Sequence, residues 1–365
     1  MRAVRIEASG FRNLARLDLA LPPGGAVFLG DNGHGKTNLL ELIYYPVLYR
    51  SVRGARDAAL VQFGEPGFHL ALDFERGDRT TRAEAGFEVV GRRKRVVTDG
   101  VEAERVGQSL GDWLAVAFLP TDVSLVSGGA SERRQFLDRT LALADPGYLR
   151  ALRQYRAALE QRNAALRRAE PEIAAAFDPA VARFGAGVVT ARLAWCERFG
   201  PAWSAACAAL GEDMPVTLRY RGKAELASPD AWPAAFAANR KRDLALGATH
   251  AGPHRDDLTL DLGGTPLRVA GSTGQQRTAA IALKLCERDT FEAAHGDPPA
   301  LLLDDVFAEL DRDRQERLAG RLRLGSVIQV FVTAPRQDEL PDGLDLPIYR
   351  VERGMIGTRM EWQPA

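Results

Sequence analysis

One eight-residue stretch constrains this chain more than any other feature of its sequence. The stretch comprises Gly30, Asp31, Asn32, Gly33, His34, Gly35, Lys36 and Thr37, and it fits the phosphate-loop pattern G-x-x-x-x-G-K-[ST]. An apolar run at 26–29 precedes it and predicts a buried strand, and the Leu- and Ile-rich residues 38–45 predict a helix that Pro46 ends. A strand, a glycine-rich turn and a helix in this order are the context that the motif requires.

The chemistry of such a loop follows from its backbone and from two side chains. Glycines let successive backbone N–H groups turn towards one anion, and the N-terminus of the following helix adds unpaired donors and a partial positive charge. Lys36 is predicted to reach the β- and γ-phosphates of ATP, and the Thr37 hydroxyl is predicted to bind Mg²⁺. We read the alternative, a chance match in a glycine-rich loop, as weak because the flanking elements also fit.

A second anion-binding helix start is predicted far along the chain. Ser272 is suited to cap the predicted helix at 278–294, and Gly274 allows a close backbone approach just before it. Gln275 completes an S-x-G-Q string. The sequence therefore predicts two helix N-termini suited to phosphate, and one nucleotide cannot easily use both if they lie on different faces of one subunit. A nucleotide held between two copies of the chain would use both.

Two adjacent carboxylates mark the end of a predicted buried strand. The apolar residues 300–303 run directly into Asp304 and Asp305. Ligands of α/β sheets bind at the carboxyl ends of the strands, so a surface-charge interpretation of this pair is the weaker one after a phosphate loop. Asp304 is predicted to hold Mg²⁺, directly or through water, and Asp305 to orient the attacking water. A last strand is predicted at 326–334, and it includes Thr333.

Bulk composition excludes several classes of function. The chain has 48 Lys and Arg residues against 48 Asp and Glu, so a DNA-binding surface would have to be a local patch. The three cysteines form no C-x-x-C pair, which favours reduced thiols in a cytoplasmic protein. We expect no signal peptide, because the first residues alternate in polarity, and no membrane partner, because no apolar run approaches a membrane-spanning length.

Two local basic segments are candidates for contact with DNA phosphates. The first is the predicted hairpin turn at 91–95, with four consecutive basic residues, for which a solvated hairpin tip is the alternative. The second is a predicted helix at 148–168, which carries six arginines against Glu160 alone. There the alternative is an arginine-rich surface with no ligand. In the later polar turn, His254 and Asp256 could serve as metal ligands, but structural hydrogen bonding is the favoured interpretation.

Seven strings together resemble a known family. They are Phe11-Arg12-Asn13-Leu14, the loop and helix start through Glu41, Arg133-Arg134-Gln135-Phe136-Leu137-Asp138, Gln161-Arg162-Asn163, Gly252-Pro253-His254-Arg255-Asp256-Asp257-Leu258, Ser272-Thr273-Gly274-Gln275-Gln276-Arg277, and the segment from Leu302 to Asp311. The chain is similar to SMC-class ABC-type ATPases and, in finer detail, resembles the RecF family. The resemblance implies an α/β fold: an ABC-type ATPase head with a mixed β-sheet and a phosphate loop, interrupted by a mainly helical inserted lobe. We expect the head at 1–105 and 249–365, and the lobe at 106–248.

The resemblance also implies an activity and partners. RecF-like proteins bind ATP, form a homodimer around two nucleotides, bind double-stranded or junction DNA and hydrolyse ATP slowly. With RecO and RecR they help to load RecA onto single-stranded gaps. Carried over to this chain, Arg12 and Asn13 join the phosphate loop and Asp304 at one nucleotide, and Ser272 and Gly274 cap the γ-phosphate of the partner's nucleotide. Thr121 departs from the family, which usually has Glu there, and Thr333 matches the switch histidine of other ABC ATPases.

Two other classes compete with this interpretation. A phosphotransferase that moves the γ-phosphate to a small acceptor would share the phosphate loop, but it would leave the S-x-G-Q string and the helical lobe without a role. The cytosolic subunit of an ABC transporter would have its signature much closer to the phosphate loop, whereas 238 positions separate Lys36 from Gly274 here.

Overall fold

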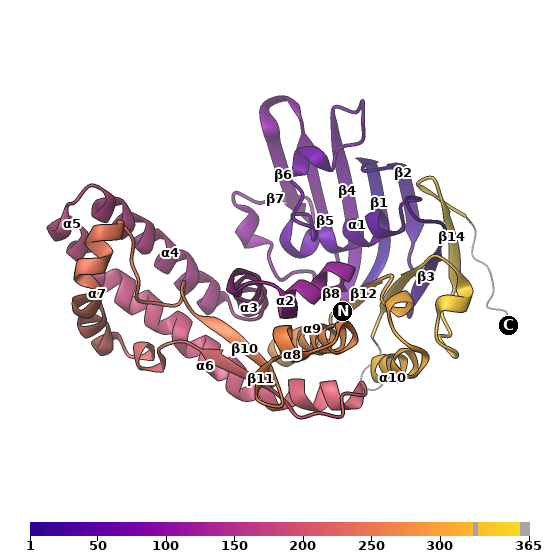
Figure 1. Ribbon diagram of the computed structural model, residues 1–365. Coiled ribbons are helices and arrows are strands. Elements are labelled where there is room, and N and C mark those ends of the chain that lie inside the picture. Colours follow the sequence, from indigo (N-terminus) through magenta and orange to yellow (C-terminus); the bar gives the residue numbers. More distant parts are fainter. Residues whose placement is uncertain (324–327, 358–365) are drawn as a thin grey trace. The chain divides into compact units, whose positions relative to one another are not determined.

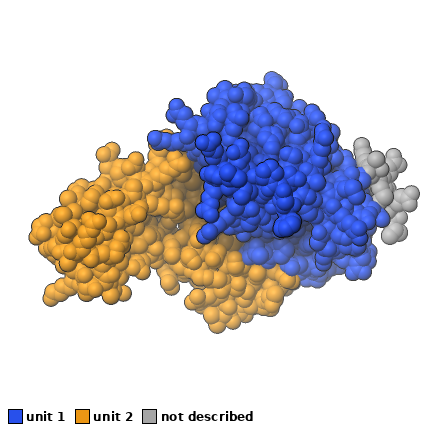
Figure 2. Space-filling model, turned by 90° about the horizontal axis from the view of Figure 1, so that it is seen from above, with its two compact units in different colours: residues 1–122, 287–365 blue, residues 123–286 orange. Residues whose placement is uncertain are grey.

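The computed structural model of the chain describes residues 1–323 and 328–357, which divide into two compact units. Unit 1 combines Met1–Asp122 with the described residues from Glu287 onward, and unit 2 comprises Val123–Cys286 (Figure 2). The division between units thus falls at 122/123 and 286/287. The domain limits expected from the sequence, 105/106 and 248/249, remain a prediction. The second division lies later because a strand at 257–262 pairs with a strand at 216–221, which ties these residues to unit 2.

Unit 1 contains two six-stranded sheets (Figure 1). The first is antiparallel, with the order β2-β1-β4-β5-β6-β7, and the second has the order β15-β14-β3-β13-β12-β8. The first sheet consists of β1 (Arg2–Phe11), β2 (Leu14–Ala20), β4 (Gly67–Arg76), β5 (Arg79–Glu88), β6 (Arg93–Thr98) and β7 (Val101–Glu102). The second consists of β3 (Gly25–Leu29), β8 (Ala115–Phe118), β12 (Ala300–Asp304), β13 (Val330–Ala334), β14 (Ile348–Glu352) and β15 (Met355–Ile356).

The second sheet is parallel from β14 to β8, and its central strands are continuously buried. Every residue of β3, β12 and β13 is buried, as expected for parallel strands that are covered on both faces. The parallel arrangement brings the carboxyl ends of β3, β12 and β13 to one edge. Residues 326 and 327 of the strand predicted at 326–334 lie outside the described residues.

Helix α1 (Lys36–Leu48) contacts strands of both sheets of unit 1. The prediction that Pro46 ends this helix was wrong, because Pro46 lies inside it and the helix ends at Leu48, before Tyr49 in the left-handed conformation. A proline removes one backbone hydrogen bond of a helix. So close to the end of α1, that loss is small against the burial of Leu42, Ile43 and Val47. Helix α10 (Arg312–Arg323) also belongs to unit 1.

Unit 2 is mainly helical. Its helices are α2 (Ser124–Ser127), α3 (Ala130–Ala144), α4 (Pro146–Arg167), α5 (Pro171–Ala176), α6 (Asp178–Ala209), α7 (Trp232–Leu246) and α8 (Leu267–Ala270). A small sheet contains β9 (Val216–Arg221), β10 (Asp257–Leu262) and β11 (Thr265–Pro266). Helix α9 (Thr273–His295) begins in unit 2 and ends in unit 1. Among the described residues, no helix has the length and apolar character needed to cross a membrane.

The strings at 133–138 and 252–258 are joined inside unit 2 by buried ion pairs and hydrogen bonds. Arg133 donates from Nε to Asp257 Oδ1 over 2.8 Å, and both side chains are buried. Asp138 accepts from the buried Arg192 over 2.7 Å. His254 lies 2.6 Å from the Tyr155 hydroxyl and 2.8 Å from the Thr249 carbonyl, and burial lowers its pKa to about 4. Buried charges need such partners, so these motif residues hold the unit together.

The two basic segments are partly used within the protein. The expected turn at 91–95 is shifted, because Arg93 already begins β6. Lys94 is half-buried, forms an ion pair with Asp57 over 2.9 Å and lies over the Tyr45 ring. In α4, Arg156 pairs with Asp138, and Arg162 is buried with two acidic partners. Each segment therefore has fewer unpaired basic side chains for contact with DNA than its sequence alone indicates.

Candidate nucleotide-binding site

The phosphate loop connects β3 to α1, and its backbone has little room for side chains at two glycines. A Cβ atom at Gly30 would lie 2.1 Å from the Val351 carbonyl oxygen. Gly35 has φ 109°, and a Cβ atom there would lie 2.7 Å from Oδ1 of Asn13. Glycine is therefore required at both positions, and the loop leads directly into the N-terminus of a 13-residue helix. This is the backbone arrangement that binds phosphate.

Lys36 is the first residue of α1 and lies almost completely within the loop. Its ammonium group donates to the carbonyl of Gly30 over 2.6 Å and to that of Asp31 over 3.2 Å, and its side chain is 4% exposed. An ammonium group has three donors, so one remains for a phosphate oxygen. The loop thus fixes the charge of Lys36 at the place where an anion would bind.

Thr37 and Asp304 meet at the edge where α1 begins and β12 ends. The Thr37 hydroxyl donates to Asp304 Oδ1 over 2.8 Å, and the Thr333 hydroxyl lies 2.9 Å from the same oxygen. Asp304 is 5% exposed, and burial raises its pKa above the ordinary value of a carboxyl group. A hydroxyl and a carboxylate oxygen are ligands that suit Mg²⁺, which usually takes one or two protein ligands together with phosphates. The residues present therefore fit that ion, and its positive charge would offset the cost of burying Asp304.

Asp305 is held in an uncommon backbone conformation beside Asp304. Its φ is 50°, in the left-handed region, and its N–H donates to the Thr333 hydroxyl over 2.9 Å. The same hydroxyl lies 3.2 Å from Asp305 Oδ1, and it can donate to one of the two carboxylates at a time. Thr333 thus orients both acids. The sequence indicated Thr333 only as the match to a switch histidine, and its contacts arise from the parallel register of β12 and β13.

Asn13 supports the phosphate loop from the turn between β1 and β2. Its amide donates to the His34 carbonyl over 3.2 Å, and its Oδ1 accepts from Asn38 over 2.9 Å. The backbone N–H of Gly354 donates to the same His34 carbonyl over 2.8 Å. These contacts fix the middle of the loop from two directions. A direct contact of Asn13 with the nucleotide remains a prediction.

A buried acid, Glu41, lies behind the loop and was missed as a functional residue by the sequence reasoning. It accepts hydrogen bonds from Arg12 over 3.0 Å and from Arg53 over 2.5 Å, as well as from the Ser51 hydroxyl. Burial alone would raise the pKa of Glu41, but the hydrogen bonds from Arg53, Arg12 and Ser51 outweigh it, and the pKa is lowered. One feature of the sequence could have indicated a role for Glu41: it is the last residue of the motif string that begins in the phosphate loop. Its partners cannot be inferred from the string. The predicted contact of Arg12 with nucleotide stays a prediction.

Replacing Glu41 with glutamine is expected to lower the free energy of unfolding by about 2 kcal/mol, less than for a fully buried pair because Arg12 and Arg53 are partly exposed. The substitution keeps the shape of the side chain but leaves two guanidinium groups without their counter-charge. Urea unfolding followed by circular dichroism measures the effect, and Glu75→Gln, which breaks an exposed pair with Arg2, is the control. Equal, small losses in both variants would contradict a structural role for Glu41.

A cavity of about 410 Å³ opens beside the phosphate loop within unit 1. Gly30, Asp31 and His34 line it from the loop, and Arg336 and Arg350 line it from the segments after β13 and within β14. Arg350 pairs in register with Leu29, the residue before the loop. Arg350 adds positive charge next to a predicted anion site, whereas Arg336 forms an ion pair with Glu339 over 3.1 Å. No motif indicated them, because Arg350 is placed by the pairing of β14 with β3 and Arg336 by that of β13 with β3.

Ser272 and Gln275 form a capping box at the start of α9 in unit 2. The Gln275 N–H donates to the Ser272 hydroxyl over 3.3 Å, and the Ser272 N–H donates to Gln275 Oε1 over 2.9 Å. Ser272 is exposed, and Gly274 is partly exposed. Because α9 is a helix of 23 residues, its accessible N-terminus carries the positive end of a long helix dipole. This N-terminus can therefore accept an anion from outside the chain.

Comparison with known proteins assigns the chain to a family, although no family model matches it. It is 38% identical over 371 residues to the DNA replication and repair protein RecF of Anaeromyxobacter sp. strain K, covering 98% of this chain and 99% of the relative. It is 34% identical to the protein of the same name from Myxococcus xanthus, covering 100% and 99% of the two chains. The chain belongs to the RecF family.

Solved structures agree with the RecF assignment. A structure of the recombination mediator protein RecF with ATP, from the RecFOR pathway, matches with a TM-score of 0.89 and 29% identity, over 98% of this chain and 97% of that one. The Smc head domain of Pyrococcus furiosus matches with a TM-score of 0.60 and 16% identity, over 99% of this chain and 96% of that one. The second likeness concerns the fold alone. Together they confirm the predicted fold class, an ABC-type ATPase head.

Proposed function

We propose that this RecF-family chain is an ATP-dependent DNA-binding protein of recombinational repair and replication restart. It binds ATP with Mg²⁺, forms a homodimer around the nucleotides and hydrolyses ATP slowly. The observation that carries the proposal is the convergence of Lys36, Thr37, Asp304 and Asp305 at one sheet edge. A RecF protein with this fold has been solved with ATP, which supports the choice of nucleotide.

Each residue of the site has a role in this proposal. Backbone N–H groups of the phosphate loop and the ammonium group of Lys36 bind the β- and γ-phosphates. Thr37 and Asp304 hold Mg²⁺, which when bound neutralises negative charge on the phosphates. Asp305, fixed by Thr333, accepts a hydrogen bond from the attacking water and orients it towards the γ-phosphate. Ser272, Gly274 and Gln275 bind the γ-phosphate of the partner's nucleotide.

The proposed partners follow from the family. The ATP-bound dimer binds double-stranded DNA or a junction of single- and double-stranded DNA, in the cytoplasm. With RecO and RecR it helps to load RecA onto single-stranded gaps. Exposed arginines of α4, such as Arg150 and Arg153, are candidates for phosphate contact, whereas Arg162 is buried in ion pairs and is not. Binding of duplex DNA should therefore weaken as salt concentration rises.

The homodimer is tested most sharply at Ser272. Aspartate and asparagine both serve well as helix N-caps, so Ser272→Asp and Ser272→Asn should both preserve α9. Aspartate adds a negative charge where the partner's γ-phosphate is proposed to bind. We expect Ser272→Asp to bind ATP normally as a monomer and to lose ATP-dependent dimerisation, whereas Ser272→Asn dimerises at least partly. Sedimentation velocity with ATP distinguishes the two, and dimerisation of both variants to the wild-type extent would contradict the proposal.

The runner-up function is transfer of the γ-phosphate to a small acceptor. It shares the phosphate loop, Lys36 and the acidic pair, but it gives the accessible N-terminus of α9 no role. Retention of duplex DNA and dimerisation with ATP, in the absence of any small acceptor, would favour the proposed function over this alternative.

A further inference from the structure

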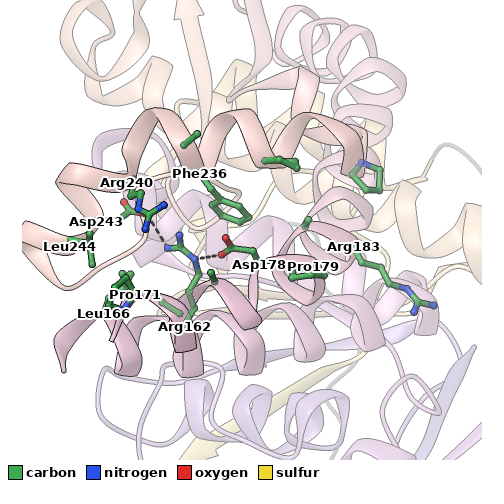
Figure 3. Close-up of a pocket in the computed structure, with 16 residues that line it drawn as sticks. Arg162, Leu166, Pro171, Asp178, Pro179, Arg183, Phe236, Arg240, Asp243 and Leu244 are labelled. Carbon is green, nitrogen blue, oxygen red and sulfur yellow. Dashed lines mark hydrogen bonds and ion pairs between the residues drawn. The ribbon is translucent and has the colours of Figure 1, made fainter. Parts of the chain in front are cut away.

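Unit 2 contains a groove of about 500 Å³ that has no part in the proposed nucleotide site. Figure 3 shows α7 along one side of this groove and segments of α4, α5 and α6 along the other. A volume of this size accommodates a ligand as large as a few amino-acid side chains.

At the centre of the groove, one buried guanidinium is paired with two carboxylates. Arg162 is buried, pairs with Asp178 over 2.7 Å and with Asp243 over 2.9 Å, and also donates to the Thr249 hydroxyl. Its guanidinium lies 4.5 Å from the centre of the Phe236 ring. Because these contacts satisfy the positive charge of Arg162, the centre offers no strong site for a buried anion. It offers a guanidinium plane and the Phe236 ring, against which an apolar group can pack.

The walls of the groove are largely apolar and stiff. The apolar lining includes Leu166, Pro171, Ala174, Pro179, Pro233 and Leu244. Proline and alanine side chains lose little conformational entropy when they are covered, so the walls are pre-organised for a ligand. An aromatic or branched aliphatic side chain would bury apolar surface there.

Positive charge lies at the two ends. Arg240 and Arg183 both line the groove and are exposed, and Figure 3 draws them on opposite sides of Phe236 and Asp178. Neither has an ion-pair partner within the described part of the chain. Lys241 and Arg242, also exposed, follow Arg240 on α7. The groove therefore combines an apolar middle with basic ends.

We infer that this groove binds an acidic peptide segment of a partner protein, which inserts an apolar side chain between α7 and α6 and places carboxylates near Arg240 and Arg183. A small anion would need a buried charge partner, and the centre provides none. Duplex DNA would contact the basic residues through its phosphates, and such contacts make no use of an apolar groove. A peptide can place acidic and apolar groups along one strand and meet both features.

The test uses the full chain and a fluorescein-labelled peptide, Glu-Asp-Glu-Phe-Leu-Asp-Glu, in fluorescence anisotropy without nucleotide. Ala237 is exposed and lines the groove, whereas its exposed neighbour Ala238 does not. We expect Ala237→Trp to fill the groove and weaken peptide binding about tenfold or more, and Ala238→Trp to leave it nearly unchanged. Ala175→Trp, which blocks the groove from α5, should act like Ala237→Trp, and melting temperatures verify that each variant is folded.

Four further outcomes decide the inference. A peptide with Ser in place of Phe and Leu should bind much more weakly. Equal binding of the two peptides would mean that they bind by nonspecific charge attraction and would contradict the inference. Failure of the original peptide to bind, or equal losses in Ala237→Trp and Ala238→Trp, would overturn the proposal. If Ala237→Trp instead weakens binding of a 20-base-pair duplex and leaves the peptide unaffected, the groove serves nucleic acid. None of these results depends on the ATP site, so they can fail or succeed separately from the proposed function.

Discussion

Replacing Lys36 with alanine is expected to weaken ATP binding on the order of 100-fold, and with it to abolish ATP-dependent dimerisation and DNA retention. Hydrogen bonds to charged groups contribute about 1.5–3 kcal/mol each, so the loss of this ammonium group at the phosphates corresponds to one to two orders of magnitude in affinity. The loop carbonyls of Gly30 and Asp31 now hold the ammonium group within the loop. Isothermal titration with ATP measures the loss.

The experiment on Lys36→Ala needs a control that shows whether the phosphate loop stays intact. Because Lys36 also contacts the carbonyls of Gly30 and Asp31, its removal can disturb the backbone, and Lys36→Arg keeps a positive charge there with a different geometry. Both variants should melt within a few degrees of the wild type. If folded Lys36→Ala still dimerises with ATP as the wild type does, the nucleotide does not control association through this loop.

Replacing Asp305 with asparagine is expected to slow ATP hydrolysis about 100-fold while leaving ATP binding and dimerisation intact. Asparagine has the shape of aspartate and tolerates the left-handed backbone found at this position, where φ is 50°. Its amide retains an oxygen that can accept from Thr333, but it cannot accept the water's proton as a carboxylate does. Phosphate release during steady-state turnover measures the effect.

The contrast with Asp304 makes this second prediction specific. Asp304→Asn removes the carboxylate next to Thr37. ATP binding should therefore require a higher Mg²⁺ concentration, and turnover should fall as well. A titration of Mg²⁺ at fixed ATP separates the two acids. Wild-type turnover in Asp305→Asn would remove Asp305 from the catalytic role. A shift of its Mg²⁺ titration as large as that of Asp304→Asn would make it a ligand instead.

The sequence was sufficient to predict those parts of the fold and of the site that depend on local contacts. The phosphate loop depends on glycines and one helix start within eight residues, and the strand before Asp304 is a continuous apolar run. The helix predicted at 148–168 coincides with α4, Pro146–Arg167, to within two residues at each end. These features are set by backbone sterics and by burial over a few turns. Both can be inferred from residues that are close together in the sequence.

The sequence was insufficient where contacts join distant segments. Glu41 is buried with Arg12, which lies 29 positions away, and Thr333 reaches Asp304 only because β12 and β13 are parallel neighbours. Lys94 seemed free in a basic run, but it pairs with Asp57. The local rule places a helix end at Pro46, because it ignores the burial of the residues around that position. Tertiary packing, which the local pattern does not contain, decided each of these positions.

The mass of the protein in solution with ATP tests the central claim most directly. Asp305→Asn with ATP and Mg²⁺, which should hold the bound nucleotide longest, is measured by light scattering beside the same variant with ADP. We predict a mass of two chains with ATP and of one chain with ADP, because the γ-phosphate is proposed to join the phosphate loop of one chain to the start of α9 in the other. A single-chain mass with saturating ATP would contradict a nucleotide held between two copies.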